Sequence, residues 1–388
     1  MKVATFKHPT QVNGGSMKPG EALLVPDVDA ARIAVQYPEL VDVGALDGHY
    51  RKYDGHDLSG KSLLFVRAGG LGDLLFLTPL LRHLDGKYKH AGLAVACGRS
   101  GHGVFLRNPH VRRILSYPVR LTDFVKYDYQ LLFENTLETS TDPNLHAVDV
   151  FARHAGLDDL DDRSLDYDVD PAEANKAKNI LRYELGAKPS AVEPPVLPDV
   201  AVGIHVRASS PVRTYPLANT LLVAAAFGST GYRVFLLGTK RDWDKVVGYK
   251  DAPAPELDGV VNLCGRFKSI DRTVAFLARL DLLIGPDSSL VHFAGALRIP
   301  TVALYGPFPG AVRTRYYPNC VTLEGRYQYR RGLQRRECTP CFKHGHLPCP
   351  RAGDDGASPC LKNLQPADVV AAAYDVLQER GKALDDPR

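Results

Sequence analysis

Two series of alternating strand and helix signals, separated by a proline-rich stretch, constrain this chain most strongly. Each series contains short apolar runs, such as KSLLFVRA in the first and VAVGIHV in the second, and longer segments of helical periodicity. Apolar runs of this length are typical of strands buried in a parallel sheet, whose crossovers are helices. Between the series lie four prolines that exclude a continuous helix or central strand: Pro189, Pro194, Pro195 and Pro198.

The alternation predicts an α/β protein with two doubly wound domains facing a cleft, over residues 59–186 and 200–388. The proline-rich residues 187–199 are predicted to be the linker between them. The last segment, QPADVVAAAYDVLQERG, is predicted to form an amphipathic helix with Pro366 in its first turn.

Residues 1–58 are predicted to form a small β-rich N-terminal module, because NG and PG turn signals separate its short apolar runs. A short amphipathic helix is expected within it, with Val28, Ile33 and Val35 on the apolar side. Two interpretations of the module stay open. It resembles small N-terminal modules of bacteriophage structural proteins, or it is an extension that packs on the main body.

The charge balance is mild, with 48 Lys+Arg against 44 Asp+Glu and a net charge of +4 over 388 residues. Proteins that coat nucleic acid have domains dominated by basic residues, so this class is disfavoured. No apolar run approaches the roughly 18–20 residues of a membrane helix. The segment MKVATFKHPTQVNGG lacks the apolar centre of a secretory signal. We therefore expect a soluble, cytoplasmic protein, with the inner face of a membrane as an alternative place of action.

The segment RAGGLGDLLFLTP, residues 67–79, places glycines between a predicted buried strand and a predicted helix. Gly70 and Gly72 would let backbone amides approach an anion or an acceptor at the helix start. The spacing matches neither the G-x-G-x-x-G nor the Walker motif. Asp73 follows in the first helical turn, where it either favours the helix dipole or acts as a general base toward an acceptor hydroxyl.

A second junction of strand and helix carries Asp287, Ser288 and Ser289, directly after the predicted strand DLLIGP. Aspartate and serine are favoured N-cap residues, which gives a purely structural interpretation. The alternative is a cradle for a diphosphate and a ribose, to which the amides of the helix start contribute. His292 follows one turn later and is either structural or a donor to phosphate.

The loop RASSPVRTYP, beyond the predicted strand VAVGIHV, contains Arg207 and Arg213. Arginine donates through a planar fork that matches phosphate, so a phosphate clamp is one interpretation and a solvated basic loop is the other. Together with Gly70 and Gly72, Arg207 is a candidate for contacts to the acceptor or to phosphate.

In order and separation, these three segments resemble glycosyltransferase family 9, which contains the lipopolysaccharide heptosyltransferases. The resemblance rests on R-x-G-G-L-G-D-x-L-x-x-x-P near the front, on SPVRTYP, and on P-D-S-x-x-x-H-x-A-x-A-L-x-I-P-T-V-A-L-Y-G-P near the back. It covers roughly residues 61–380. It implies the GT-B fold of two Rossmann-like domains, with the acceptor on the first and the nucleotide sugar on the second. It also implies metal-independent transfer with inversion of the anomeric centre.

Carried over by position, the resemblance makes Asp73 the catalytic base. It assigns to the donor site Arg213, Asp287, Ser288, Ser289 and His292. Ser289 stands where the family usually has glycine, which would tighten the approach of the donor diphosphate. The donor site lacks a D-x-D metal motif, and the acid-rich residues 158–170 are predicted to be a solvated loop.

The resemblance implies that catalysis needs no cofactor, that an ADP-sugar, with heptose as a candidate sugar, is the favoured donor, and that a glycan or glycolipid such as lipopolysaccharide core is the acceptor. Peripheral membrane contact would follow from such an acceptor. A phage-encoded transferase acting on a DNA base, a protein or another glycan is an alternative. So is a non-catalytic binding protein with a transferase fold, although retention of Asp73, Asp287 and His292 argues against it. Nucleic acid is the less favoured partner.

Four of the seven cysteines crowd into one segment, with His344 and His346 among them: Cys338, Cys341, Cys349 and Cys360. A C-x-x-C pair is typical of a structural zinc site, but the second half of this cluster lacks a matching pair. Structural zinc and reduced structural thiols are therefore both open interpretations.

A basic segment, GRYQYRRGLQRRE, precedes the cysteines. Its arginines are Arg326, Arg330, Arg331, Arg335 and Arg336. They are predicted either to form a solvated basic loop or to attract an anionic acceptor, whether a phosphorylated sugar, lipid headgroups or nucleic acid.

Overall fold

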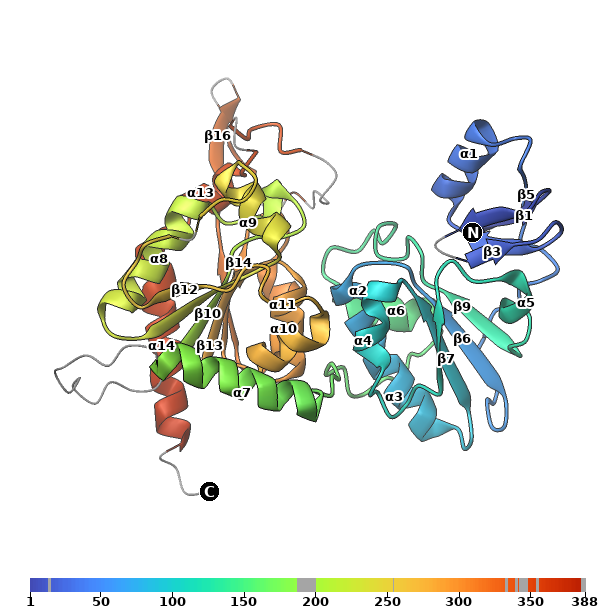
Figure 1. Cartoon of the computed structure of the whole chain (residues 1–388), viewed down its shortest axis with the longest axis horizontal. Coiled ribbons are helices and arrows are strands. Elements are labelled where there is room, and N and C mark those ends of the chain that lie inside the picture. The colour runs from blue at the N-terminus through green and yellow to red at the C-terminus, as the bar shows by residue number, and fades with distance from the viewer. Residues whose placement is uncertain are drawn as a thin grey trace. The chain divides into compact units, whose positions relative to one another are not determined.

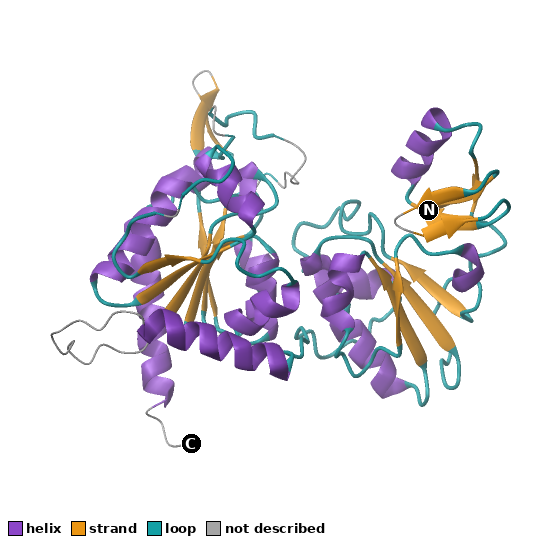
Figure 2. Ribbon diagram, in the orientation of Figure 1, coloured by secondary structure: helices purple, strands orange, loops and turns teal. Residues whose placement is uncertain are grey.

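The computed structural model divides the chain into two compact units, Met1–Asp166 and Tyr167–Arg388. It describes residues 1–12, 15–186, 200–253, 255–331, 334–338, 341, 348–353 and 356–384. Each unit contains a parallel sheet covered by helices (Figures 1 and 2). The predicted α/β class is therefore confirmed.

The first unit is built on a four-stranded parallel sheet with the strand order β8-β7-β6-β9. Its strands are β6 (Ser62–Val66), β7 (Gly92–Cys97), β8 (Arg113–Ser116) and β9 (Tyr129–Leu132). Its helices are α2 (Leu71–Leu75), α3 (Thr78–Lys87), α4 (His102–Phe105), α5 (Leu121–Phe124) and α6 (Ala147–His154). Because the strands are parallel, the loops that follow them gather at one edge of the sheet.

The N-terminal module is an antiparallel sheet of order β4-β1-β5 with one helix and one small hairpin. Its elements are β1 (Lys2–Phe6), β2 (Thr10–Val12), β3 (Gly15–Met17), β4 (Ala22–Val25), α1 (Asp27–Gln36) and β5 (Val41–Ala45). Leu24 of this sheet shares a buried cluster with Leu64 and Val66 of β6. Its amide also donates to the carbonyl of Val119 at 2.8 Å. The module is thus an extension packed onto the first α/β sheet (Figure 1).

The prediction that Val28 and Val35 lie on the buried side of α1 is wrong. Val28 and Val35 are 77% and 82% exposed, whereas Ala30 is buried and Ile33 packs partly against the core of the module. The helix is short, and the small face around Ala30 allows it to lie close to the sheet. The two valines therefore face solvent.

The second unit is built on a six-stranded parallel sheet with the strand order β12-β11-β10-β13-β14-β15. Its strands are β10 (Ala201–His205), β11 (Arg233–Leu237), β12 (Val260–Asn262), β13 (Leu282–Pro286), β14 (Thr301–Tyr305) and β15 (Cys320–Glu324). Its helices are α7 (Pro171–Gly186), α8 (Leu217–Ser229), α9 (Lys240–Val247), α10 (Ile270–Leu277), α11 (Ser289–Ala296), α12 (Gly310–Arg313), α13 (Pro359–Asn363) and α14 (Pro366–Leu384). A hairpin of β16 (Gln328–Arg331) and β17 (Gln334–Glu337) follows the sheet.

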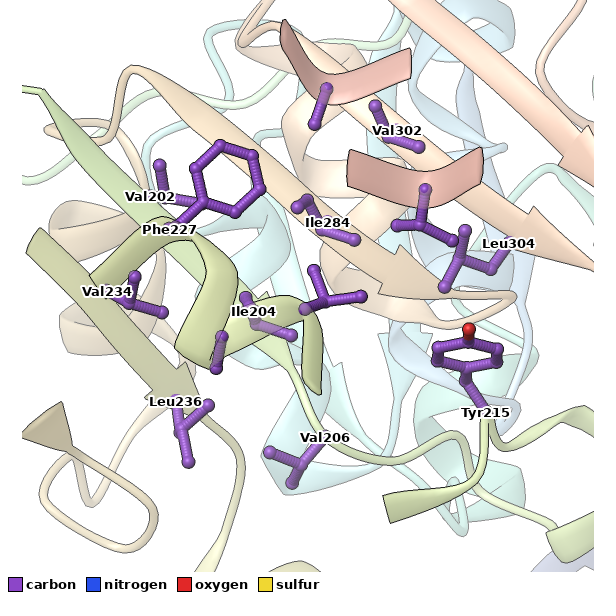
Figure 3. Close-up of a cluster of buried hydrophobic side chains, with 14 of the residues drawn as sticks. Val202, Ile204, Val206, Tyr215, Phe227, Val234, Leu236, Ile284, Val302 and Leu304 are labelled. Atoms are coloured by element: carbon purple, nitrogen blue, oxygen red, sulfur yellow. The ribbon is translucent and has the colours of Figure 1, made fainter. Parts of the chain in front are cut away.

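One face of this sheet is closed by α8 and α14, and apolar side chains dominate the core there. Figure 3 shows Phe227 of α8 among the side chains of Val202, Ile204 and Val234. All four residues are almost completely removed from water. Burial of these side chains fixes the positions of the strands, and the strands in turn fix the polar loops at their carboxyl ends.

The first unit ends at Asp166 and the second begins at Tyr167, whereas the sequence predicts the boundary at residues 187–199. Tyr167 donates through its hydroxyl to Asp271 at 3.1 Å, and Glu173 pairs with Arg272 at 3.2 Å. These contacts attach α7 to α10, so the chain belongs to the second unit from Tyr167 onward. The proline-rich residues themselves lie outside the described part of the chain.

Leu24→Ala should destabilise the first unit by about 2–5 kcal/mol, because it opens a cavity between the module and the main sheet. Hydrogen exchange at the amides of β6 and β7 measures this loss. Val28→Ala is the matched control, since an exposed position should change stability by no more than about 0.5 kcal/mol. Unchanged exchange in β6 and β7 for Leu24→Ala would mean that the module contributes nothing to the unit it covers.

Candidate functional site

The carboxyl edge of the first sheet holds a buried arginine surrounded by acceptors. Arg67 follows β6 directly and is only 2% exposed. Its guanidinium donates to Asp73 Oδ2 at 2.7 Å, to Glu138 Oε1 at 3.0 Å and to the carbonyl of Phe133 at 2.7 Å. Burial alone would lower the pKa of Arg67, but the carboxylates of Asp73 and Glu138 outweigh it and raise the pKa above its ordinary value. Arg67 is therefore a permanent cation that fixes Asp73 in place.

Asp73 remains accessible, with 29% of its side chain exposed. Gly69 makes its position possible, because a Cβ there would lie 2.8 Å from Asp73 Oδ2 and 2.5 Å from Arg67 Nε. Gly70 precedes α2 as its N-cap, and the carbonyl of Gly72 accepts from the amide of Phe76. The two predicted glycines thus shape the turn before and within α2.

Glu134 and Glu138 are residues that sequence reasoning missed. The guanidinium of Arg67 forms ion pairs with both Glu138 and Asp73. Glu134 accepts from the amide of Ala68, and burial raises the pKa of its carboxyl above the ordinary value. Both follow β9, whose carboxyl end lies beside that of β6 in the sheet. A search for acids just beyond predicted strand ends would have found them.

In the second unit, a buried carboxylate occupies the carboxyl end of β13. Asp287 is 4% exposed, and its Oδ2 lies 3.3 Å from Arg213. Its Oδ1 lies 4.0 Å from His292 Nε2. Burial favours the protonated acid, but the charges of Arg213, Arg313 and His292 prevail and hold the pKa of Asp287 below its ordinary value. Asp287 therefore orients the cationic side chains that surround it.

The serines at the start of α11 differ in their roles. Ser288 is the N-cap of this helix, yet its side chain makes no capping bond. Its hydroxyl instead shares a hydrogen bond of 2.8 Å with His205 Nδ1. Burial lowers the pKa of His205 to about 4, so this imidazole is neutral at physiological pH. Ser289 is the first residue of the helix and is partly buried.

His292 is buried and shares a hydrogen bond of 2.7 Å between its Nδ1 and the hydroxyl of Tyr317. The other ring nitrogen faces Asp287. Neither Tyr317 nor His205 was among the predicted residues, because each lies far in sequence from the motif it contacts. The structure therefore brings together Arg213, Asp287, Ser288 and His292 as the sequence motifs predict.

Arg207 takes a different position from the two glycines with which it was grouped. It belongs to the second unit and is 9% exposed, whereas Gly70 and Gly72 belong to the first unit. Its guanidinium lies 3.4 Å from Asp242 Oδ1 in the first turn of α9. The ion pair that the structure describes for Arg207 therefore joins two residues of the second unit.

The four clustered cysteines line one small pocket of about 10 Å³. They are Cys338, Cys341, Cys349 and Cys360. All seven cysteines of the chain are free thiols. Among the described residues, no three Cys, His, Asp or Glu side chains converge in a geometry that holds a metal ion. His344 and His346 lie outside the described residues.

Part of the basic segment forms the hairpin β16–β17, in which Arg330 lies directly opposite Arg335. Arg326 lies 3.9 Å from Glu337, so one of the positive charges of the segment is balanced within the segment itself. The segment is therefore more ordered than the expected loop. In the part of the chain that the structure describes, none of the helices is long and apolar enough to cross a bilayer.

The model of glycosyltransferase family 9 (heptosyltransferase) matches residues 129–345. This chain belongs to glycosyltransferase family 9. The match spans Arg213, Asp287 and His292, so the family prediction and the enzyme class, a glycosyltransferase, are both confirmed. Lipooligosaccharide heptosyltransferase 2 of Haemophilus influenzae is 22% identical over 293 residues, which cover 63% of this chain and 83% of the relative.

Solved structures of glycosyltransferases share the fold. A glycosyltransferase of family 9 from Veillonella parvula has a TM-score of 0.60 and 18% identity, covering 84% of this chain and 99% of its own. The E. coli ADP-heptose lipopolysaccharide heptosyltransferase II has a TM-score of 0.60 and 16% identity, covering 82% and 99%. The iron-containing dodecameric glycosyltransferase TibC from E. coli has a TM-score of 0.55 and 17% identity, covering 84% and 80%. The predicted GT-B fold of this family 9 chain is confirmed.

Replacing His205 should change how the stability of this family 9 enzyme depends on pH. An unfolded histidine binds a proton below about pH 6.5, whereas folded His205 stays neutral down to about pH 4. The unfolded state therefore gains protons first, and the free energy of unfolding should fall by about 2 kcal/mol between pH 7 and pH 5 through this group alone. Urea unfolding of wild type and His205→Gln at both pH values measures the difference.

The loss between pH 7 and pH 5 should be smaller in His205→Gln than in wild type. His90→Gln, which replaces an exposed histidine, is the matched control. Equal losses in wild type and His205→Gln would contradict the buried, neutral state of His205.

Proposed function

We propose that this enzyme transfers a sugar, with heptose the first candidate, from an ADP-sugar to a hydroxyl of a bacterial surface glycan such as lipopolysaccharide core. The observation that carries the proposal is the grouping of Arg213 with two buried side chains, Asp287 and His292, at the carboxyl end of β13. Relatives named as heptosyltransferases support the donor and the acceptor. A glycolipid acceptor would bring the enzyme to the cytoplasmic face of a membrane.

The donor site supplies the groups that a departing nucleoside diphosphate needs. Arg213 carries a fixed charge and a planar set of donors, and Asp287 holds it in place. Ser288 offers a hydroxyl that His205 orients, and α11 begins beside it. Negative charge grows on the diphosphate as its bond to the anomeric carbon breaks. Fixed donors aimed at that charge lower the barrier most effectively.

Asp73 is the proposed base. An acceptor hydroxyl attacks the anomeric carbon on the face opposite the diphosphate, and the proton of that hydroxyl passes to the carboxylate of Asp73. The new glycosidic bond forms as the bond to the diphosphate breaks, so the anomeric centre inverts. Arg67 donates to the carboxylate at 2.7 Å and so fixes its position before the reaction. This step uses the side chains of the protein and needs no metal ion.

Asp73→Asn should lower kcat by about 10²–10⁴, since an amide cannot take the proton. The KM for the donor should stay within about threefold, because Asp73 contributes to the chemical step rather than to donor binding. Release of ADP from ADP-heptose in the presence of acceptor measures both constants. Asp158→Asn, at an exposed aspartate of the same unit, is the control. Full activity of Asp73→Asn would exclude Asp73 as the base.

We also propose that the cysteine cluster holds a structural metal ion. Four thiols around one small pocket form a donor set suited to tetrahedral zinc or iron, and the solved structure of TibC contains iron. Cys338, Cys341, Cys349 and Cys360 would be the ligands of the ion. The ion would join the segment before α13 to the loop after β17.

Metal analysis of the purified protein should find about one zinc or iron ion per chain, and Cys341→Ser should lose it. Cys264→Ser is the matched control, because Cys264 lies in the second unit away from the cluster. The metal proposal would be contradicted if the purified wild-type protein held no metal and if added zinc or iron did not raise its melting temperature. Reduced structural thiols would then be the interpretation that stands.

A further inference from the structure

Tyr317 is a buried residue of the second unit, in the segment between α12 and β15. Its amide donates to the carbonyl of Thr314 at 2.8 Å. Its ring packs against α11 at the position where that helix has a glycine. A Cβ at Gly295 would lie 2.6, 2.7 and 2.9 Å from Cγ, Cδ1 and Cδ2 of the ring, well inside carbon–carbon contact distance. The ring is therefore held close to the helix that also carries His292.

The hydroxyl of Tyr317 lies 2.7 Å from His292 Nδ1, and the two rings are inclined at 69°. Burial raises the pKa of Tyr317 well above its ordinary value, so this hydroxyl keeps its proton. A phenol can both donate and accept a hydrogen bond. It donates to Nδ1 of a neutral imidazole that is protonated at Nε2, and it accepts from Nδ1 of a charged imidazole. In both states the bond keeps Nδ1 directed at Tyr317.

Asp287 faces the other nitrogen of the imidazole. Its Oδ1 lies 4.0 Å from His292 Nε2. Burial would raise the pKa of this carboxyl, but the charges around it hold the pKa below its ordinary value, so Asp287 is an anion. At 4.0 Å the two atoms form no hydrogen bond, yet the carboxylate attracts a proton on Nε2 and repels a lone pair there. Tyr317 and Asp287 together therefore favour a protonated Nε2.

The same carboxylate holds Arg213. Oδ2 of Asp287 and the backbone carbonyl of that residue each accept from Arg213 Nη1 at 3.3 Å. Ser209 Oγ accepts from Nη2 at 2.5 Å. Nε of Arg213 is buried and has no hydrogen-bond partner among the residues that the structure describes. A buried donor without a partner is unfavourable, so this N–H is suited to an anion that enters the site.

We infer that Tyr317 is a positioning residue for the donor site. Its hydroxyl orients His292, which orients the carboxylate of Asp287. That carboxylate in turn aims Arg213 at the diphosphate of the donor. The inference rests on the proposed function, because it assumes that Arg213 contacts the diphosphate. Tyr317 acts through these side chains in series and makes no contact with the donor itself.

The first test measures the protonation of the His292 imidazole in the full chain without ligand. Two-bond proton–nitrogen NMR spectra distinguish protonated from unprotonated ring nitrogens, and the signals of His292 are those that disappear in His292→Gln. We expect a protonated Nε2 in the wild type. Tyr317→Phe removes only the hydroxyl and should move the Nδ1 resonance. An unprotonated Nε2 in the wild type, or an unchanged Nδ1 resonance in Tyr317→Phe, would overturn the inference.

Tyr305→Phe is the matched control. Tyr305 is completely buried in β14 of the same unit, and within the described part of the chain its hydroxyl has no hydrogen-bond partner. Loss of this hydroxyl should leave both ring nitrogens of His292 as they are in the wild type. If the two phenylalanine variants moved the Nδ1 resonance equally, the specific role of Tyr317 would be refuted.

The second test measures ADP binding by calorimetry in the wild type, in Tyr317→Phe, in Arg213→Gln and in the double variant. Tyr317→Phe should raise the Kd for ADP about three- to tenfold, the effect of losing one hydrogen bond. Tyr305→Phe should change it less than about twofold. In the Arg213→Gln background, Tyr317→Phe should also change the Kd less than about twofold, because residues that act in series are strongly coupled. An unchanged Kd in Tyr317→Phe, or an equal loss in both backgrounds, would contradict the inference.

The outcomes for the two proposals are separate. If the wild-type chain binds ADP and transfers sugar from ADP-heptose normally while Tyr317→Phe has no effect, the proposed function stands and the inference fails. If the wild-type chain does not bind ADP, the proposed function fails, and the spectra of His292 alone decide whether Tyr317 orients that imidazole.

Discussion

Each unit buries an ionised side chain at the carboxyl edge of its parallel sheet, and each candidate site is arranged around the need to balance that charge. In the first unit the ion is Arg67, and in the second it is Asp287. A buried ion without partners costs several kcal/mol, so the sequence must supply opposite charges nearby. Asp73 and Glu138 do this for Arg67, and Arg213 does it for Asp287. Two of these partners, Asp73 and Arg213, are the residues proposed as the base and as a donor to the diphosphate.

The course of the chain could be predicted from its sequence better than the partners of its side chains. Apolar runs such as SLLFV and LLIGP identify buried strands, because both faces of a parallel strand are covered. Local patterns carry no information on contacts across the sheet. Arg67 meets Glu138 across 71 positions of sequence, and His205 meets Ser288 across 83. These partners become visible only when neighbouring strands are aligned.

Two misjudged elements share one physical cause. Periodicity predicts an apolar side of α1 that contains Val28 and Val35, yet the helix packs through Ala30 and both valines are exposed. Proline density predicts the boundary between the units at residues 187–199, yet α7 is attached to α10 through Glu173 and Arg272. In both cases a tertiary contact of small or charged residues outweighed a local signal. Composition and periodicity report where apolar and turn-forming residues lie in the sequence. They give no information on contacts between small or charged residues that are far apart in the sequence.

The place of α7 has a consequence for how this chain can vary. The polypeptide crosses from one unit to the other at Asp166–Tyr167, and the proline-rich residues 187–199 connect α7 to β10, both of which belong to the second unit. Insertions or deletions among these prolines therefore alter a connection internal to one folding unit and leave the crossing itself untouched. Changes of length in that segment therefore act within the second unit and leave the crossing at Asp166–Tyr167 as it is.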